Sequence, residues 1–365
     1  MKPEENYLRF FLGANTPQGF VSRFDQLADV EDGWRLMVIK GGPGSGKSTM
    51  MKHIAQHFAK QKEPVELIHC SSDVDSIDGV ILPGVKVALA DGTRPHAIEP
   101  QYPGVFEHLI DLTACWDSSL LYAHRDAVIS LSRSCSRCHE HCCRFLSAAG
   151  SLSGDTYRIA LECVNTTKLA GYITRLTDRE LKLFKKDPGK ESVRFLNAVT
   201  NKGTVCFDQT ANLLCERIYL IQDDYGAVSR LLLNALRAKA LSAGYDIISC
   251  YCPLAPFDKL EQLFIPSLRL GFMTSNFFHD FGARIDPYRI VNSQRFQDAD
   301  TLKSSKKRIQ FNRKAIVRML DQAQLLLKDA KNIHDELESY YVHATDFDKV
   351  EALTANVLDS IVRLQ

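Results

Sequence analysis

The sequence predicts an α/β fold in which two related parallel-sheet domains follow one another. Three observations carry this prediction: a glycine-rich loop between a strand and a helix, a second copy of the surrounding segment, and a long helical region after each copy. A chain of 365 residues is long enough for two domains of ordinary size. Its composition, with 45% hydrophobic and 24% charged residues, is typical of globular proteins.

The glycine-rich loop follows an apolar run at residues 36–39 and matches the phosphate-binding P-loop pattern G-x-x-x-x-G-K-[ST] at every fixed position. Glycines permit the turns that bring successive N–H groups onto phosphate oxygens, and the next helix directs its positive end at them. Lys47 is expected to bridge the β- and γ-phosphates and Ser48 to bind Mg²⁺. The predicted nucleotide-binding residues are Gly41, Gly42, Pro43, Gly44, Ser45, Gly46, Lys47, Ser48 and Thr49.

Acidic residues follow the next two predicted strands. Residues 65–70 read as one strand and residues 85–91 as another, which ends in Asp91. Phosphoryl chemistry needs a carboxylate for Mg²⁺ at the end of a neighbouring strand, so Asp91 is the predicted acid, with an ordinary Asp-Gly turn as the alternative. Open parallel sheets bind ligands at the carboxyl ends of their strands, so Asp73 is expected to face the γ-phosphate. The predicted catalytic residues are therefore Lys47, Asp73 and Asp91.

The chain contains an internal repeat. Residues 11–21 align with residues 195–205, and six of the eleven positions are identical. Matches in the same order continue for about 85 residues, which indicates duplication of a whole domain. The pairs include Cys70 with Cys250, Asp78 with Asp258, Pro83 with Pro266, Asp91 with Thr274 and His96 with His279. The predicted domains are residues 1–188 and 189–365, both P-loop NTPase-like.

The second copy has lost the chemistry of the loop. Residues 223–230 read Asp-Asp-Tyr-Gly-Ala-Val-Ser-Arg, which aligns Ser229 with Lys47 and Arg230 with Ser48. Two carboxylates would repel a polyphosphate, and the glycines of the cradle are missing. The sequence therefore predicts an inactive pseudo-domain beside a nucleotide-binding one.

Each copy ends in a mostly helical extension, at about residues 105–186 and 295–365. In the first, a break is expected at residues 149–151, with Asp155 capping the next helix; in the second, the break is expected at residues 344–346. Two helices around a break predict a helical hairpin projecting from each domain. These hairpins are candidate surfaces for a protein partner.

A dense thiol and imidazole cluster lies in the first extension. On a helix, Cys135, Cys138, His139 and Cys142 fall on one face, with the soft ligands that zinc prefers. The alternative is a set of small buried or surface thiols. The chain has eleven cysteines, a net charge of +1, no signal-like N-terminus and no apolar run of membrane length. We therefore expect a cytoplasmic location, no membrane insertion, and no general affinity for nucleic acid.

Several motifs together resemble a family of uncharacterised bacterial tandem P-loop proteins described as ATPase-like. They are Phe-Leu-Gly-Ala-Asn-Thr-Pro-Gln-Gly-Phe at residues 11–20, the P-loop, His-Cys-Ser-Ser-Asp at 69–73, Asp-Gly-Val-Ile-Leu-Pro at 78–83 and Asp-Gly-Thr-Arg-Pro-His at 91–96. The resemblance implies ATP binding by the first copy. The second loop departs from family members that retain a second P-loop.

The leading expectation is an ATP-binding protein that hydrolyses ATP with Mg²⁺ in its first domain. One alternative is a nucleotide or small-molecule kinase, with the helical extension as a lid and Asp73 as the base. Another is a nucleotide-gated interaction module without turnover.

Overall fold

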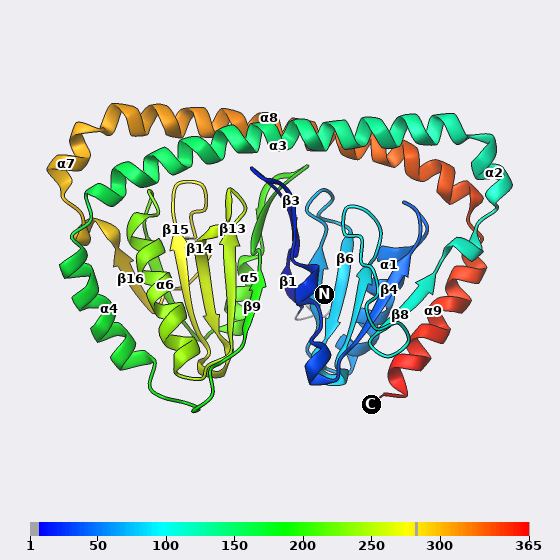
Figure 1. Ribbon diagram of the computed structural model, residues 1–365, viewed down its shortest axis with the longest axis horizontal. Helices are drawn as coiled ribbons and strands as arrows, with labels where there is room; N and C mark the ends of the chain where they lie inside the picture. The colour runs from blue at the N-terminus through cyan, green and yellow to red at the C-terminus, as the bar shows by residue number, and fades with distance from the viewer. Residues whose placement is uncertain (1–6, 282–283, 365) are drawn as a thin grey trace.

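The computed structural model describes residues 7–281 and 284–364 and places two sheet domains beneath a pair of long helices (Figure 1). The expected α/β class with two tandem sheet domains is confirmed. The first copy contains β1 (Leu8–Phe10), β2 (Gly13–Thr16), β3 (Gly19–Ser22), β4 (Arg35–Lys40), α1 (Lys47–Lys60), β5 (Glu66–His69), β6 (Ile77–Leu82), β7 (Val87–Asp91), β8 (Glu107–Asp111), α2 (Ser118–Ala123), α3 (Arg125–Glu162) and α4 (Thr166–Glu180).

The second copy repeats this order of elements, with one short helix, α5, added after the hairpin of β10 and β11. It contains β9 (Glu191–Arg194), β10 (Asn197–Thr200), β11 (Gly203–Cys206), α5 (Asp208–Leu214), β12 (Arg217–Gln222), α6 (Ala227–Ser242), β13 (Ile247–Cys252), β14 (Ala255–Ile265), β15 (Leu270–Ser275), β16 (Arg289–Asn292), α7 (Ala299–Ser304), α8 (Lys306–Ala344) and α9 (Phe347–Val362). Among the described residues, no helix combines the length and the apolarity needed to cross a membrane.

Both six-stranded sheets are mixed, which corrects the expectation of parallel sheets. Their strand orders are β1-β5-β6-β7-β4-β8 and β16-β12-β15-β14-β13-β9. In the first sheet β6 runs antiparallel to β5 and β7, and in the second β14 runs antiparallel to β13 and β15. A parallel connection needs a crossover of about a dozen residues or more, and only residues 70–76 join β5 to β6. Strand β4, which leads into the glycine-rich loop, still has parallel neighbours on both sides, β7 and β8.

The inner faces of the two sheets share one hydrophobic core. Alternate residues of β4 point to opposite faces, so Val38 lies in this shared core while Ile39 lies beneath α1. On the other side, Leu220 of β12 enters the same shared core. The sheets also meet through Phe11 and Phe195, whose backbones exchange two hydrogen bonds of 2.9 Å. These two residues are repeat equivalents, so the copies pack about an approximate twofold axis.

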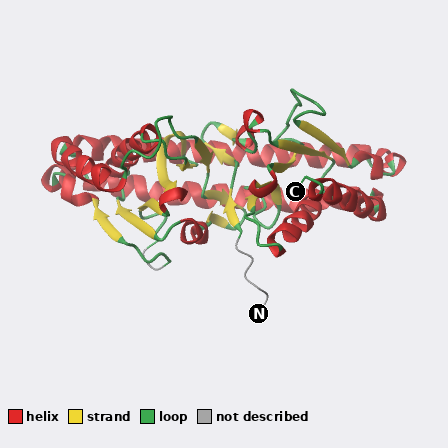
Figure 2. Ribbon diagram, turned by 90° about the horizontal axis from the view of Figure 1, so that it is seen from below, coloured by secondary structure: helices red, strands yellow, loops and turns green. Residues whose placement is uncertain are grey.

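The long helices α3 and α8 lie side by side in opposite directions across both sheets (Figures 1 and 2). Near their middle, Cys142 and Leu146 of α3 pack on Ala323 and Leu327 of α8. Together the two helices form a roof over the ends of both sheets. The expected hairpins do not form, because each long helix pairs with its counterpart from the other copy.

The terminal helix of each extension packs on the other copy's sheet. Leu169 and Leu176 of α4 lie in the core formed by α6 and the second sheet. Conversely, Val357 and Ile361 of α9 lie in the core formed by α1 and the first sheet. Figure 1 shows this exchange as red α9 beside blue α1 and green α4 beside yellow-green α6. The helical segments expected to extend their own domains therefore complete the opposite ones.

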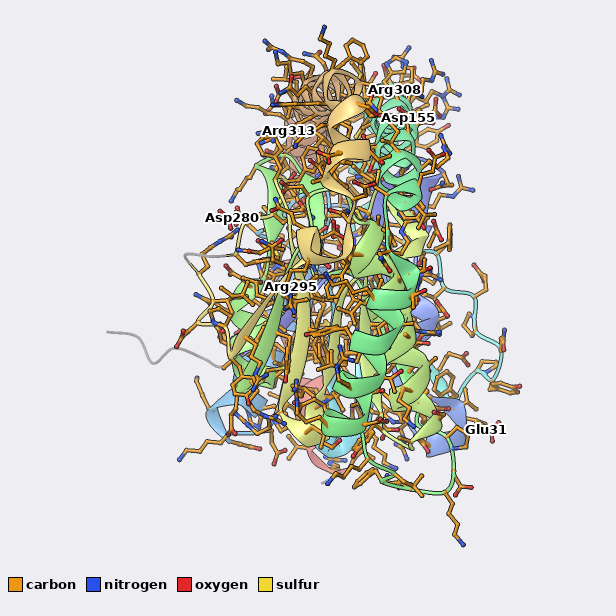
Figure 3. All side chains as sticks on the ribbon, turned by 90° about the vertical axis from the view of Figure 1, so that its left-hand side faces the viewer. Glu31, Asp155, Asp280, Arg295, Arg308 and Arg313 are labelled. Carbon is orange, nitrogen blue, oxygen red and sulfur yellow. The ribbon has the colours of Figure 1, made fainter. Side chains whose placement is uncertain are left out.

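The break expected at residues 149–151 is absent, because α3 continues to Glu162. A side chain at Gly150 would collide with the ring of Pro17, so this glycine lets α3 approach the first hairpin closely. Asp155 lies inside the helix rather than at its cap. Its carboxylate accepts hydrogen bonds from Arg308 Nε at 2.9 Å and Asn312 Nδ2 at 2.8 Å on α8 (Figure 3). Asn165 is the residue that caps α4.

Candidate functional site

The glycine-rich loop lies between β4 and α1 with the backbone that its sequence predicts. Gly44 and Gly46 have φ values of 67° and 91°, in the left-handed region that side chains disfavour. Ser45 Oγ donates to the Gly42 carbonyl at 2.8 Å and holds the turn closed. Because α1 begins at Lys47, its unpaired N–H groups point into the loop and create a site of positive potential.

The structure brings Lys47 and Asp91 together. Lys47 Nζ donates to the carbonyls of Gly41 at 3.0 Å and Gly42 at 2.5 Å, and it lies 3.6 Å from Asp91 Oδ2. Strand β7 pairs in parallel with β4, and its last residue, Asp91, is opposite Ile39. The other oxygen of Asp91 accepts a hydrogen bond from the Thr93 amide at 2.9 Å, which fixes the carboxylate beside the loop. Asp91 is the last residue of its strand, as its sequence predicts.

The loop after β5 faces the same cleft. Asp73 Oδ2 accepts a hydrogen bond from Ser76 Oγ at 3.1 Å and lies 3.4 Å from Lys331 Nζ. Ser48 Oγ accepts the amide of Ile77 at 3.1 Å, which links the start of α1 to β6. Lys331 belongs to α8, in the second copy. Sequence reasoning missed it because no motif relates that helix to the first domain's loop.

The roof helix α8 covers the outer side of the glycine-rich loop. A Cβ on Gly42 would collide with the ring of Tyr341, and one on Gly44 would lie 3.0 Å from Val342 Cγ2. A Cβ on Gly46 would lie 3.1 Å from Val350 Cγ1 of α9. The glycines are therefore required both by the turn and by the close approach of the C-terminal helices.

A cleft of about 1790 Å³ lies between the carboxyl ends of the first sheet's strands and the roof helices. Residues 43–49 line its floor together with Asp73 and Asp91, and α3 and α8 line its other side. Small-molecule sites commonly measure about 300–1,000 Å³. The cleft therefore has room for a nucleotide and for a second group.

A buried acid and histidine pair supports this cleft. His96 Nε2 lies 2.9 Å from Asp78 Oδ2, and both side chains are largely shielded from solvent. Although burial opposes the charged imidazole, the Asp78 carboxylate outweighs it and raises the pKa of His96 above its ordinary value. The pair holds the loop after β7, which carries Arg94, against β6.

The second copy also has a buried acid at this position, but that acid is a different residue and pairs with Lys259. The strand registers before Pro83 and Pro266 place Glu261, not Asp258, at the position of Asp78. Glu261 is fully buried and lies within electrostatic reach of a histidine, the repeat equivalent of His96. The sequence alignment of Asp78 with Asp258 was wrong, because β14 starts earlier than β6 and shifts the apparent match.

Replacing His96 by glutamine is expected to change how stability depends on pH. A histidine whose pKa is raised in the folded state stabilises the fold. The contribution is complete below the pKa of the unfolded state, about 6.5, and disappears as the pH rises through the pKa of the folded state. The stability difference between wild type and variant should therefore be larger near pH 6 than near pH 9. Urea unfolding at both pH values measures it, and a difference that grew with pH would contradict the assignment.

The comparison with the variant is needed because other histidines act in the opposite direction. Burial lowers the pKa of His69 to about 4, so below pH 6.5 the unfolded state takes up its proton first. That effect makes the wild type less stable as the pH falls towards 4. It is common to wild type and variant and cancels in their difference.

The second loop is shorter than the first. Four residues separate β12 from α6, against six between β4 and α1. Both helices begin directly after a glycine with positive φ, so Ala227 takes the place of Lys47. The predicted placement of Ser229 and Arg230 at the lysine and the serine is therefore wrong. Ala227 and Val228 follow this second turn, where Lys47 and Ser48 follow the first.

An internal carboxylate fills the anion position of the second loop. Asp223 is 1% exposed, and its Oδ2 accepts the amide of Ser229 at 2.7 Å while Oδ1 accepts that of Tyr225 at 3.3 Å. The Ser229 N–H belongs to the first turn of α6, at the positive end of the helix, where an anion is stabilised. A polyphosphate would have to displace this carboxylate.

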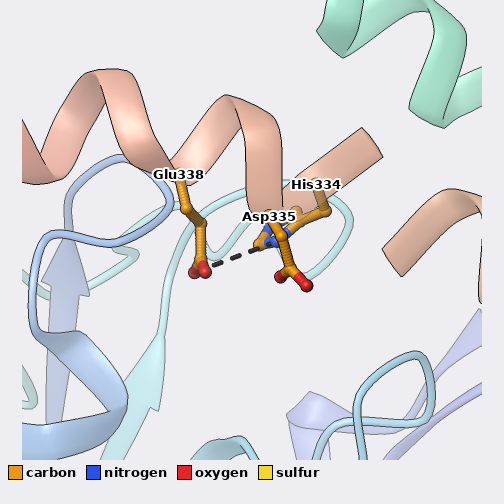
Figure 4. A group of neighbouring side chains, drawn as sticks. All are labelled: His334, Asp335 and Glu338. Carbon is orange, nitrogen blue, oxygen red and sulfur yellow. Dashed lines mark ion pairs between the residues drawn. The ribbon is translucent and has the colours of Figure 1, made fainter. Parts of the chain in front are cut away.

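The predicted zinc residues are not brought together. Cys142 is fully buried between the long helices, which raises the pKa of its thiol to about 12, and the Cys135 thiol lies 3.7 Å from the Ala330 carbonyl. In the part of the chain that the structure describes, one group of three potential ligands converges within 4.8 Å. It consists of His334, Asp335 and Glu338, on adjacent turns of α8 (Figure 4).

The chain was compared with protein-family models, curated proteins and solved structures. No family model, no curated protein and no solved structure matches it. The site must therefore be interpreted from its own residues.

Proposed function

We propose that the first domain binds a nucleoside triphosphate with Mg²⁺ in the cleft over the P-loop and hydrolyses it, with ATP as the substrate. The observation that carries this proposal is the 3.6 Å distance between Lys47, at the start of the helix that follows β4, and Asp91, at the end of the parallel neighbour β7. A lysine and a carboxylate at this place match the charges of a phosphate chain and of its metal ion.

The residues present fit such a ligand. The positive φ values of Gly44 and Gly46 allow the tight turn in which successive backbone N–H groups would hold the phosphates. Ser48 and Asp91 would hold Mg²⁺, which prefers oxygen ligands and supplies charge neutralisation in phosphoryl transfer. Asp73 would orient the attacking water, and Lys331 holds its carboxylate in place. Lys47 would neutralise the phosphate oxygens.

Binding of a fluorescent ATP analogue with and without Mg²⁺, followed by measurement of phosphate release, tests the proposal. Saturable binding that Mg²⁺ strengthens, followed by phosphate release, is the expected result. Absence of binding at millimolar nucleotide would refute the proposal. Nucleotide binding without phosphate release would support the binding site and refute ATP hydrolysis.

The Asp91→Asn variant is expected to lose most of the effect of Mg²⁺ on nucleotide binding, because an amide is a weaker metal ligand than a carboxylate. Affinity in the presence of Mg²⁺ should fall about tenfold or more, as if one charged contact were lost. Titration of wild type and variant with the fluorescent analogue measures the change.

Asp111→Asn is the matched control. Asp111 ends β8, the other parallel neighbour of β4, and it accepts the amide of Thr113 as Asp91 accepts that of Thr93. It lies outside the cleft lining. Equal effects of the two substitutions would show that Asp91 has no special role in binding Mg²⁺.

Phosphoryl transfer to an acceptor is the second candidate function. The volume of the cleft favours it, because about 1790 Å³ exceeds the usual size of a single small-molecule site. Phosphate release that required an added metabolite mixture, with no release in its absence, would favour transfer over hydrolysis.

A further inference from the structure

The second copy contains a cavity of about 490 Å³ in the place that corresponds to the first copy's cleft. It lies between the second loop, the end of β15 and the roof helices, and no residue of the P-loop lines it. Its volume falls within the usual range for small-molecule sites, about 300–1,000 Å³. Any function of this cavity is independent of the function proposed for the first domain.

The residues that would bind a magnesium-bound polyphosphate are replaced here. The Asp223 carboxylate accepts the Ser229 N–H in the first turn of α6, and Thr274 stands at the register position of Asp91. Carboxylates that neither pair with a cation nor bind a metal repel phosphate. The ligand of this cavity therefore belongs to a different class from that of the first cleft.

One part of the cavity wall is apolar and aromatic. Phe277 and Phe278 occupy the positions of Arg94 and Pro95 in the first copy, as the shared histidine that follows them indicates. The ring of Tyr225 and the side chains of α8 add to the same wall, including Ile316, which is 2% exposed. Such surfaces favour a flat hydrophobic ligand, because aromatic rings stack well on one another.

One carboxylate, Asp224, lines this cavity without an ion pair among the described residues. Two cations in the cavity likewise have no carboxylate partner among the described residues, so the unpaired groups carry a net positive charge. The two cations are Arg313, whose guanidinium lies over the ring of Phe277, and Lys306. The other two lysines of the lining are already neutralised: Lys259 by Glu261 at 2.6 Å, and Lys303 by Asp300 at 3.0 Å. Figure 3 shows Arg313 on the roof helix at the top of the second domain.

An unpaired amide completes the set of polar groups. Both polar atoms of the Gln297 side chain are shielded from solvent and lack a hydrogen-bond partner within the described residues. Gln297 lines the cavity. A buried amide without a partner is costly, so a ligand with a hydrogen-bonding group would stabilise this arrangement.

We propose that this second cavity binds a small aromatic anion, with the rings against Phe277 and Tyr225 and the negative group at Arg313 and Lys306. The aromatic wall accounts for the flat ligand, and the two unneutralised cations account for its charge. The filled loop excludes a polyphosphate from the same place.

Equilibrium binding of 8-anilinonaphthalene-1-sulfonate to the full chain tests the proposal, because this fluorescent probe is an aromatic anion. N-phenyl-1-naphthylamine has the same ring system without the sulfonate and tests the charge. We expect one saturable site for the anionic probe and at least about fivefold weaker binding of the neutral one, in line with a partly exposed charge contact. Equal affinities, or no saturable binding of the anionic probe, would overturn the proposal.

Substitutions of residues that line the cavity test whether the fluorescent probe binds there. Arg313→Gln should lower the affinity for the sulfonate probe about fivefold or more and leave the affinity for the neutral probe nearly unchanged, because only a charge contact is lost. Phe277→Ala should weaken both probes. Arg318→Gln is the matched control, since Arg318 is an exposed arginine of the same helix outside the cavity lining. If Arg313→Gln and Arg318→Gln had the same effect, the probe would be bound elsewhere and the proposal would fail.

Discussion

Replacing Lys47 by alanine is expected to lower phosphate release from ATP at least about 100-fold, the usual effect of removing one preorganised group that stabilises transition-state charge. Lys47 is 9% exposed, and its ammonium group lies between the loop carbonyls and Asp91. Without it, Asp91 would repel the phosphate chain with no cation between them. Nucleotide affinity should fall as well, because a lysine at this position contacts phosphate in the ground state.

The measurement compares phosphate release and binding of a fluorescent ATP analogue in wild type and variant. Lys60→Ala is the control, because Lys60 lies exposed at the far end of the same helix. Far-ultraviolet circular dichroism checks that the variant is folded. If Lys47→Ala bound and hydrolysed ATP as the wild type does, nucleotide chemistry at this loop would be excluded.

Replacing Ile361 by alanine is expected to destabilise the first domain by about 2–4 kcal/mol, as large-to-small substitutions in a packed core do. Ile361 is 0% exposed and belongs to α9, the helix that packs beside α1 on the first sheet. The loss should appear in the N-terminal copy although the residue is almost the last of the chain.

Tryptophan fluorescence during urea unfolding reports this effect. Both tryptophans, Trp34 and Trp116, lie in the first copy, so their emission follows that part of the fold. Leu325→Ala is the control, because that side chain is 53% exposed and its loss should change stability by only about 0.5 kcal/mol or less. An Ile361→Ala variant with unchanged tryptophan unfolding would show that α9 does not pack on the first sheet.

The local elements around the P-loop could be predicted because short-range patterns determine them. The apolar run at residues 36–39 forms β4, the helical spacing after the loop forms α1, and the strand ending in Asp91 is β7. Asp73 and Asp91 could be proposed as site residues without knowledge of tertiary contacts, because residue type and spacing indicate where strands lie and end. The P-loop motif likewise indicated which end of the sheet would contain the site.

Contacts between segments far apart in the chain could not be predicted. Lys331 and Tyr341 belong to α8, and nothing in their sequence indicates that they lie over a loop near residue 44. The length of the second loop was also misjudged, because a sequence match at one glycine does not show where a helix begins. Ala227, rather than Ser229, follows the turn.

The exchange of terminal helices depends on the continuity of α3 through Gly150, where the sequence had predicted a break. Gly150 costs about 1 kcal/mol relative to alanine in a helix, which favours a break at this position. In the structure this glycine packs against Pro17, and α3 stays continuous for 38 residues. At 1.5 Å per residue such a helix spans about 57 Å, far enough to carry α4 to the other sheet.

The sequence by itself determined the duplication, the glycine-rich loop between β4 and α1, the acid at the end of β7 and the absence of that glycine-rich motif from the second copy. These are local patterns of residue type and spacing. Only the tertiary structure decided which sheet each terminal helix covers and which residues form the roof of the cleft. The amphipathic pattern of a terminal helix indicates that its apolar face is buried. It does not indicate on which sheet the helix packs, because the two related sheets offer similar surfaces. The continuity of α3 through Gly150 decides between them.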